Sequence, residues 1–324
     1  MSVEEQILLI LQKSRETRLH DLVELTGASR QMVHRVVKNL VQRGLIEKLG
    51  SAPRTYYRLI QSKPIALGRI AQDSADFLDE HFIQVTETGK RLDGAEAMAY
   101  WCEKQKLPFE KTVQEFIITR KRYLEYFLKN GLIDGLQKIK STKGFDHIGV
   151  DQIYYLDFYA IERFGKTRLG LLLHLAKQGQ NRKLMNEIID LSKSRIEGLI
   201  KARKVDAVGF IPPTIKREVQ FMKVLERKLN LSLPHIGLVK VTGEIAIPQK
   251  ALSKIEERVN NARASILLAE KRKFKKVLLI DDAIGSGATI NETALKLKEQ
   301  SVASQVIGLA ITGSFKGFDV IQEV

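Results

Sequence analysis

The chain has 324 residues, of which 44% are hydrophobic and 28% are charged, which is the composition of a globular protein with room for two or three domains. The single cysteine, Cys102, excludes a disulfide framework and a zinc site made of cysteine clusters. No apolar run approaches the ~18 residues of a membrane span, and the N-terminus lacks a signal-peptide pattern, so we expect a cytoplasmic protein with no membrane partner.

The net charge of +15 suits an anionic partner, but it is unevenly distributed. Residues 1–62 carry 10 basic and 6 acidic side chains, residues 63–150 carry 14 and 13, and residues 151–324 carry 29 and 19. The excess in the last part can serve phosphate binding or simply solubility. Charge alone therefore does not locate a nucleic-acid site.

Residues 1–62 are predicted to form one small domain of helices and a hairpin. Apolar spacing predicts three helices, at 3–13, 19–25 and 30–43. Ser29 is placed to cap the third helix, and Gly44 follows its end. Two strands are predicted around the turn 50–54, at 45–48 and 55–59. This order resembles the winged helix-turn-helix domains of bacterial transcription regulators.

In that family the third helix enters the major groove of double-stranded DNA. The polar face of the third helix presents Arg30, Gln31, His34, Arg35 and Lys38. Arginine and glutamine can recognise base edges, whereas lysine suits phosphates. Arg54, at the tip of the predicted hairpin, can reach a neighbouring phosphate or the minor groove. The resemblance implies binding of double-stranded DNA; a protein-contact module with a solvated helix face is the alternative.

Residues 63–150 are predicted to be a mainly helical middle region that resembles no family we can identify. Residues 62–67, with Pro64, suggest a linker. A hairpin and two helices are predicted after it, at 82–92, 94–106 and 112–129. Trp101 and the aromatic residues of the second helix favour a core or a dimer contact over a ligand cage. We expect a homodimer.

From about residue 150 apolar strands alternate with helices, which predicts an α/β domain over 151–324. The expected architecture is a parallel sheet with helices on both faces. Helices are predicted at 167–178, 181–202, 215–229 and 248–261. Strands are predicted at 205–211, 235–241, 276–281 and 305–312.

The strongest local signal is an apolar run, residues 277–280, that ends on two adjacent carboxylates, Asp281 and Asp282. A buried parallel strand is a continuous apolar run, and it delivers these acids to the carboxyl edge of a sheet, where ligands of open α/β folds bind. A loop of small and hydroxyl residues follows, and then a helix is predicted at 290–300. Glycines let the backbone approach a phosphate, and free N–H groups at the helix start favour an anion.

Residues 277–289 resemble the phosphoribosyl pyrophosphate (PRPP) signature of type I phosphoribosyltransferases. The resemblance implies that two acids face the ribose hydroxyls and that the loop from Gly285 onward cradles the 5'-phosphate. The PRPP-binding residues predicted in this way are Asp281, Asp282, Ala283, Ile284, Gly285, Ser286, Gly287, Ala288 and Thr289. Mg²⁺ is expected to arrive with PRPP, with the two acids as its candidate protein ligands and no metal cluster besides. A Walker A loop is excluded, because no Gly-Lys-Ser/Thr begins the helix.

More narrowly, residues 155–313 resemble ComF-type phosphoribosyltransferases. Residues 159–178 resemble that family's opening segment, and Ile211-Pro212-Pro213 stands where the family has a proline-containing loop that faces pyrophosphate. The family also has a Gln-x-x-Leu-Ser sequence that leads to an arginine and an asparagine. Four of its positions are matched here by Gln249, Leu252, Ser253 and Asn260, whereas the arginine, Arg258, lies one position later than in the family. The resemblance implies that Pro212 and Pro213, followed by Thr214, face the pyrophosphate. Lys240 follows the second predicted strand and can offer the pyrophosphate a point charge, with Lys216 and Arg217 as alternatives. A solvated surface cation is the simpler interpretation of any one of these three.

Two departures from the family bear on turnover. The cysteine zinc site of many ComF proteins is missing, and residues 214–218 do not match the family's Arg-Gly-Phe-Asn loop. No catalytic general base is evident. Phe318 is a candidate to stack on a nucleobase, but it is more simply interpreted as a packing residue. We therefore expect a DNA-binding transcription regulator with PRPP or a nucleotide as effector. The alternative is an active phosphoribosyltransferase of nucleotide metabolism with a regulatory N-terminal module.

Overall fold

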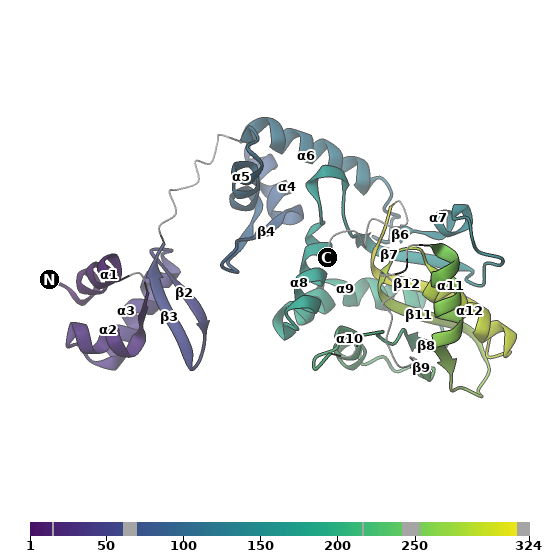
Figure 1. Ribbon diagram of the computed structural model, residues 1–324. Helices are drawn as coiled ribbons and strands as arrows, with labels where there is room; N and C mark the ends of the chain where they lie inside the picture. The colour runs from purple at the N-terminus through teal and green to yellow at the C-terminus, as the bar shows by residue number, and fades with distance from the viewer. Residues whose placement is uncertain (15, 61–69, 216, 242–251, 253, 316–324) are drawn as a thin grey trace. The chain divides into compact units, whose positions relative to one another are not determined.

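A computed structural model describes the chain apart from residues 15, 61–69, 216, 242–251, 253 and 316–324 (Figure 1). The chain divides into two compact units, residues 1–67 with 85–92, and residues 68–84 with 93–324. Some predictions fall outside the described residues: the linker at 62–67 and the roles of Lys216, Gln249, Ser253 and Phe318.

The N-terminal elements form around a small apolar core. They are α1 (Val3–Lys13), β1 (Thr17–Arg18), α2 (Leu19–Thr26), α3 (Arg30–Gln42), β2 (Ile46–Ser51) and β3 (Arg54–Leu59). The three predicted helices and the hairpin are confirmed, and Ser29 caps α3 by accepting a hydrogen bond from the Met32 amide. Strand β1 pairs with β3. The sequence did not indicate it, because a strand of only two residues is too short to show an alternating pattern. The core is formed by apolar residues of all three helices and the hairpin, among them Leu22, Val37 and Tyr57.

Residues 70–130 are mainly helical, as predicted. They form α4 (Gln72–His81), β4 (Ile83–Val85), β5 (Arg91–Asp93), α5 (Gly94–Gln105) and α6 (Phe109–Leu124). Helix α6 ends before the predicted residue 129, because the chain turns back and the Leu128 amide donates to the Leu132 carbonyl. Trp101 packs against Phe82 and Phe164, as expected for a core residue.

A five-stranded sheet organises the rest of the second unit, in the order β6-β7-β12-β11-β8. Four strands are parallel: β7 (Gln152–Phe158), β12 (Ala303–Gly313), β11 (Phe274–Ile284) and β8 (Ala207–Phe210). Strand β6 (Ile133–Asp134) is an antiparallel edge. The predicted α/β architecture is therefore present, and β6 and α7 (Leu136–Ser141) extend it to the N-terminal side of residue 151.

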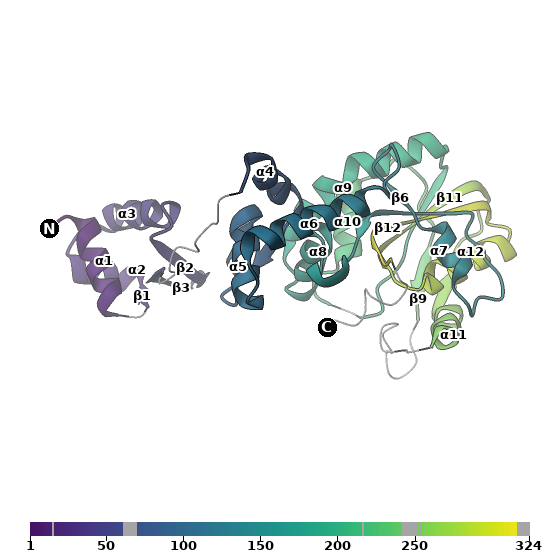
Figure 2. The ribbon, with the colours of Figure 1, turned by 90° about the horizontal axis from the view of Figure 1, so that it is seen from above.

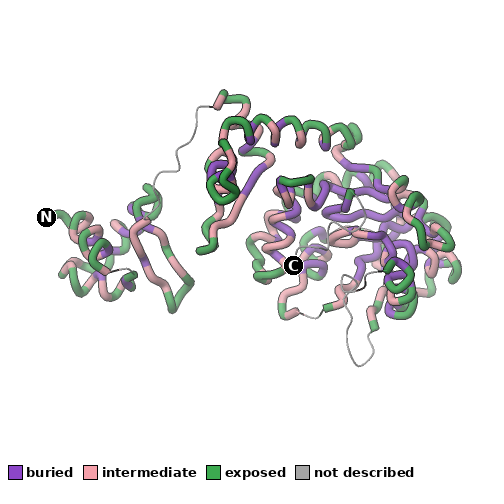
Figure 3. Tube along the Cα trace, turned by 45° about the horizontal axis from the view of Figure 1, so that its top comes forward, coloured by how far each residue is buried: buried purple, intermediate pink, exposed green. Residues whose placement is uncertain are grey.

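Helices cover both faces of this sheet (Figure 2). On one face, α8 (Arg168–Gln178), α9 (Arg182–Arg203) and α10 (Phe221–Leu229) share a core with Leu278 and Ile280. On the other face lies α12 (Ala288–Glu299), which packs against α11 (Ile255–Ser265). The strands are buried on both sides (Figure 3), which explains why their sequences are continuous apolar runs.

Three predictions in this unit are wrong in part. The helix predicted at 215–229 begins only at Phe221, because the preceding residues form a loop in which the Val219 amide is bound by Gln180. The strand predicted at 235–241 is reduced to β9 (Leu238–Lys240), and it pairs antiparallel with β10 (Ile266–Leu268) in a separate sheet. In the described part of 248–261, α11 begins at Ile255 and continues to Ser265.

Candidate functional site

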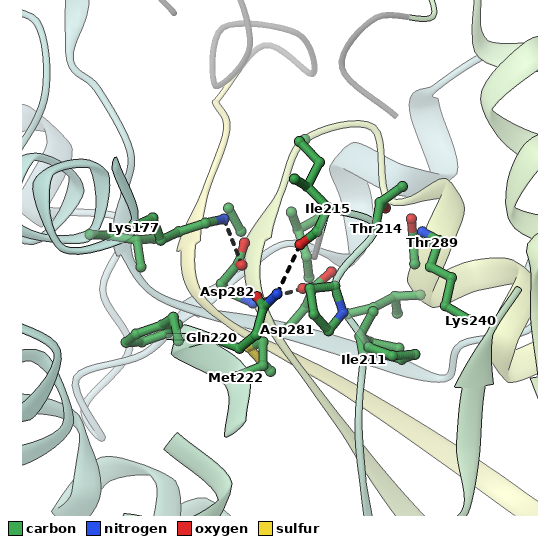
Figure 4. A pocket seen from close by; sticks show the side chains of 18 of the residues that line it. Lys177, Ile211, Thr214, Ile215, Gln220, Met222, Lys240, Asp281, Asp282 and Thr289 are labelled. Atoms are coloured by element: carbon green, nitrogen blue, oxygen red, sulfur yellow. Dashed lines mark hydrogen bonds and ion pairs between the residues drawn. The ribbon is translucent and has the colours of Figure 1, made fainter. Parts of the chain in front are cut away.

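Strand β11 carries the two acids at its carboxyl end. The strand continues to Ile284, and because side chains alternate along a strand, Asp281 and Asp282 point to opposite sides. The Asp282 carboxylate lies 2.6 Å from the Lys177 ammonium at the end of α8. The Asp281 carboxylate accepts the Asp282 amide at 2.8 Å (Figure 4). The two acids therefore have different partners, a lysine ammonium for Asp282 and a backbone amide for Asp281.

The loop after β11 turns directly into α12. Gly287 caps the helix with a φ of 87°, a left-handed conformation that favours glycine. A Cβ atom there would lie 2.5 Å from a side-chain carbon of Ile139 in α7. Lys138, also in α7, donates to the Gly285 carbonyl. Helix α7 thus holds the loop in place through Ile139 and Lys138. The first amides of α12 have no partner within the helix and are suited to bind an anion in the cavity.

One cavity of about 290 Å³ opens at this carboxyl edge. All nine residues predicted to bind PRPP, from Asp281 to Thr289, line it. The four candidates for the pyrophosphate side, Pro212, Pro213, Thr214 and Lys240, line it as well. The structure thus brings together residues that are up to 77 positions apart in the sequence, from Pro212 to Thr289.

Cationic side chains face the two acids. Burial lowers the pKa of Lys240, although the charges of Asp281 and Asp282 act in the opposite direction. Arg258 is buried, burial lowers its pKa, and its Nε donates to the Leu252 carbonyl at 2.8 Å. Arg217, one of the alternative cations, donates to the Lys177 carbonyl. A cavity lined by both buried or half-buried cations and carboxylates suits a ligand with both phosphates and hydroxyls.

Desolvation is the main cause that raises the pKa of Asp281 to about 7, and the neighbouring charge of Asp282 adds to it. The hydrogen bond from the Asp282 amide and the charges of Lys177 and Lys240 act against this rise. Near neutral pH this carboxyl group therefore changes its ability to accept hydrogen bonds.

Sequence reasoning missed the wall opposite the loop. It is formed by the residue after β7, by α8, and by the start of α10 with the residue before it: Tyr159, His174, Lys177, Gln220, Phe221 and Met222. The Tyr159 hydroxyl and His174 Nδ1 are 3.3 Å apart, and Gln220 donates to the Ile215 carbonyl at 2.9 Å (Figure 4). No linear motif marks these residues. The one available signal was the end of the helix predicted at 167–178, which places Lys177 in its last turn.

In the described part of the chain, no group of three or more His, Cys, Asp or Glu side chains is placed to hold a metal ion. Asp281 and Asp282 are two hard oxygen donors, and Mg²⁺ commonly binds through one or two carboxylates together with phosphate oxygens and water. The acid pair therefore fits a magnesium ion that arrives with a phosphorylated ligand.

The candidate DNA-binding residues belong to the N-terminal unit. All of those on α3 are exposed: Arg30, Gln31, His34, Arg35 and Lys38. The opposite face of α3 is buried through Val33, Val37 and Leu40. Arg54 is exposed where the hairpin turns from β2 to β3. Across the described residues, the structure contains no helix with the length and apolar character needed to cross a membrane.

Neither the protein-family models nor the curated proteins contain a match to this chain. Its function is therefore inferred from the geometry of the cavity and of α3.

Proposed function

We propose that the carboxyl-edge cavity binds PRPP or a related nucleotide, and that the protein is a DNA-binding transcription regulator controlled by this ligand. The observation that carries the proposal is that one cavity gathers an acid pair, a tight loop at a helix start, and the buried or half-buried cations Arg258 and Lys240. These three features match the three parts of PRPP: vicinal hydroxyls, a 5'-phosphate and a pyrophosphate.

Each part of the ligand would have its own group of residues. Asp281 and Asp282 accept hydrogen bonds from the ribose hydroxyls, because ionised carboxylates accept but do not donate. The amides from Gly285 to Ala288, with the hydroxyls of Ser286 and Thr289, hold the 5'-phosphate. Lys240 and Arg258 face the pyrophosphate, together with the Pro212–Thr214 loop. Mg²⁺, when bound with PRPP, would neutralise part of the pyrophosphate charge.

This assignment treats residues 151–324 as a type I phosphoribosyltransferase-like domain. It is supported by the parallel order of β7, β12, β11 and β8, and by the location of the cavity at their carboxyl ends. It treats residues 1–62 as a winged helix-turn-helix. Three helices, a capped third helix with a cationic outer face and a following hairpin support that part.

The alternative is an active phosphoribosyltransferase, and one residue favours it. His174 lines the cavity, and an imidazole is the side chain best suited to move a proton near neutral pH. Its partner at 3.3 Å, the Tyr159 hydroxyl, could orient the ring. Transfer to a nitrogenous acceptor would need such a base. We prefer the regulator because the chain also carries α3, which an enzyme does not need.

The two functions are separated by what PRPP does to the full-length protein. A regulator must bind PRPP with different affinity in its DNA-competent and DNA-incompetent forms, because a ligand with equal affinity for both shifts nothing. We expect a coupling of ~1–3 kcal/mol, about 5–150-fold in DNA affinity, and a reciprocal effect of DNA on PRPP affinity. The DNA site is first selected from genomic fragments, and its affinity is then measured with and without PRPP and Mg²⁺.

The matching measurement is pyrophosphate release from PRPP across a panel of nucleobases and amines. Coupling without turnover supports the regulator. Turnover without coupling would replace it with the enzyme. A His174→Gln variant adds a control, since it should abolish turnover in the enzyme but leave the coupling of a regulator unchanged.

A further inference from the structure

The edge of the sheet opposite the cavity, where the parallel strands begin, is strongly cationic; we call it the amino edge. The basic run Lys271-Arg272-Lys273-Phe274-Lys275-Lys276 covers the three residues before β11 and the first three residues of that strand. Lys271, Arg272, Lys273 and Lys275 are all exposed. The basic run accounts for a large share of the charge excess that the sequence located in residues 151–324 without assigning it.

Hydrogen bonds connect the basic run to two segments that carry further cations. Asp206 accepts both the Lys275 and the Lys276 amides at 2.9 Å, and it follows Lys204 at the end of α9. The Arg272 guanidinium donates to the His235 carbonyl at 2.8 Å, and His235 pairs with Glu226 in α10. The amino edge thus includes exposed cations from both helix ends, Lys201, Lys204, Arg227 and Lys228.

The carboxylates of this edge are already engaged. Asp206 binds the two backbone amides of the basic run, and Glu226 pairs with His235. Glu270 binds Arg272, an interaction that lowers the pKa of Glu270 to about 2. The exposed cations of the basic run and of the two helix ends outnumber these three carboxylates, so the surface potential here is positive.

Part of this charge has an ordinary explanation. Cations at helix C-termini are stabilised by the helix dipole, and this accounts for Lys201, Lys204, Arg227 and Lys228. It does not account for Lys271, Lys273 and Lys275, which lie in a loop and at the start of a strand. Packing five cations into six residues costs electrostatic repulsion, and the described structure gives no fold-stabilising role to the three lysine side chains.

We infer that the amino edge is a second nucleic-acid surface, which contacts the phosphates of duplex DNA without recognising the bases. The inference goes beyond the DNA contact of α3, and its choice of DNA over other polyanions rests on the proposed function. The cations at the start of β11 and at the neighbouring ends of α9 and α10 form a band of closely spaced charges, which suits a backbone with one negative charge per ~1.7 Å of duplex.

An anionic membrane is the other large polyanion that such a band could meet. Surfaces that lie on membranes combine cations with apolar side chains that enter the lipid. Among the described residues of the basic run and the two helix ends, no large hydrophobic side chain is exposed. The nucleic acid is therefore the better match.

The test uses the full-length protein with its α3 contacts removed by Arg30→Ala, Arg35→Ala and Lys38→Ala. In this background Lys271→Gln, Lys273→Gln and Lys275→Gln neutralise the basic run and leave the Arg272–Glu270 pair intact. The control variant neutralises three other exposed lysines of the same unit, Lys111, Lys129 and Lys143. The probe is a short duplex of arbitrary sequence, titrated over a range of salt concentrations.

We expect the α3 variant to keep weak, salt-sensitive duplex binding. Neutralising the basic run should reduce that affinity about tenfold or more and lower the slope of log K against log salt by about 2–3, since each phosphate contact contributes ~0.9. The control variant should bind as its parent does. Circular dichroism and PRPP binding, measured on all variants, verify that the second unit is intact.

Equal duplex affinity of the basic-run and control variants would overturn the inference, and so would complete loss of binding in the α3 variant alone. Binding to phosphatidylserine vesicles but not to duplex would assign the surface to membranes instead. If the α3 substitutions change nothing while the basic-run substitutions do, the inference stands and the DNA-binding role proposed for α3 fails.

Discussion

The face of α3 and the carboxyl-edge cavity use charge in opposite ways. The five candidate DNA-binding residues of α3 are all exposed and come from one helix. The charges of the cavity come from β9, α8, α11 and the end of β11, and they are partly buried against one another. A surface of the first kind attracts any polyanion, whereas a cavity of the second kind selects a small ligand by shape and by the placement of its charges.

The difference also decides how each region responds to conditions. Exposed cations are screened by salt within a Debye length of ~10 Å at 0.1 M. Partly buried groups are screened less, but their pKa values move, as those of Asp281 and Lys240 do. Salt should therefore control the contact of α3 with DNA, and pH should control the cavity.

The largest expected effect is in the cavity. The double substitution Asp281→Asn with Asp282→Asn removes two charged acceptors at a strand end but no core volume. Hydrogen bonds to charged groups contribute ~1.5–3 kcal/mol each, so PRPP affinity should fall roughly a thousandfold. Calorimetry with PRPP and Mg²⁺ measures it.

A matched control replaces two exposed acids of the same unit, Asp73→Asn with Asp190→Asn. It changes the net charge by the same amount and should leave PRPP affinity unchanged. An equal loss in both double variants would show that the long-range field, and not the acid pair, holds the ligand.

The next effect is on DNA. Arg30→Ala, Arg35→Ala and Lys38→Ala together should weaken binding to a selected DNA site roughly a hundredfold and lower the salt slope by about 3. PRPP affinity without DNA should not change. If the triple variant binds the site normally at every salt concentration, the N-terminal unit contacts protein instead of DNA.

These two regions also show what the sequence could predict. Helix α3 is a local structure: its apolar spacing, the cap at Ser29 and its polar face are all contained in fourteen residues, and the structure has each of them. The loop from Asp281 to Thr289 is local in the same sense. Strand alternation and a helix start are short-range properties, so both could be inferred from adjacent residues.

The rest of the cavity is not local. Lys177 reaches Asp282 across 105 positions, and Ile139 supports Gly287 from a helix that the sequence did not indicate. The sequence predicts that the helix of α10 begins at Ile215, but two contacts hold the described residues before Phe221 in a loop that lines the cavity. The Val219 amide donates to the Gln180 side chain, and the Gln220 side chain donates to the Ile215 carbonyl. Tertiary contacts override local propensity at these residues, and a single sequence does not encode those contacts in a periodic form.

A smaller effect is expected from pH. Because burial and Asp282 raise the pKa of Asp281 to about 7, the carboxyl group is mostly protonated one unit below that value and mostly ionised one unit above. PRPP affinity should rise about tenfold over this window as the acceptor ionises, which is ~1.4 kcal/mol per unit of pKa shift. In Asp281→Asn this tenfold rise should disappear, and what remains comes from the ligand's phosphates and the other titratable groups that line the cavity.

Folding stability should move in the opposite direction. A carboxyl group whose pKa is raised from 3.8 to about 7 binds a proton more tightly in the folded state. Its contribution to stability therefore falls as the pH rises from the unfolded-state pKa of 3.8 to the folded-state pKa of about 7. Asp281→Asn removes this loss and should raise the melting temperature above pH 7 but not near pH 4. A melting temperature that is insensitive to the substitution at both pH values would show that Asp281 is not desolvated.

The smallest expected effect tests whether the two regions are energetically separate. Ser29 accepts the Met32 amide at 3.3 Å at the start of α3, in a unit with its own apolar core. Ser29→Ala should cost ~1 kcal/mol, the usual contribution of a cap, and should increase amide exchange in the first turn of α3. Arg30 and Gln31 lie in that turn, so DNA affinity should fall by up to about fivefold, with PRPP affinity unchanged. The control is Ser194→Ala, an exposed serine inside α9, where alanine is the better helix former and no loss is expected. If Ser29→Ala weakens PRPP binding in the absence of DNA, the two units share stability, and the effector can act on α3 through the fold itself.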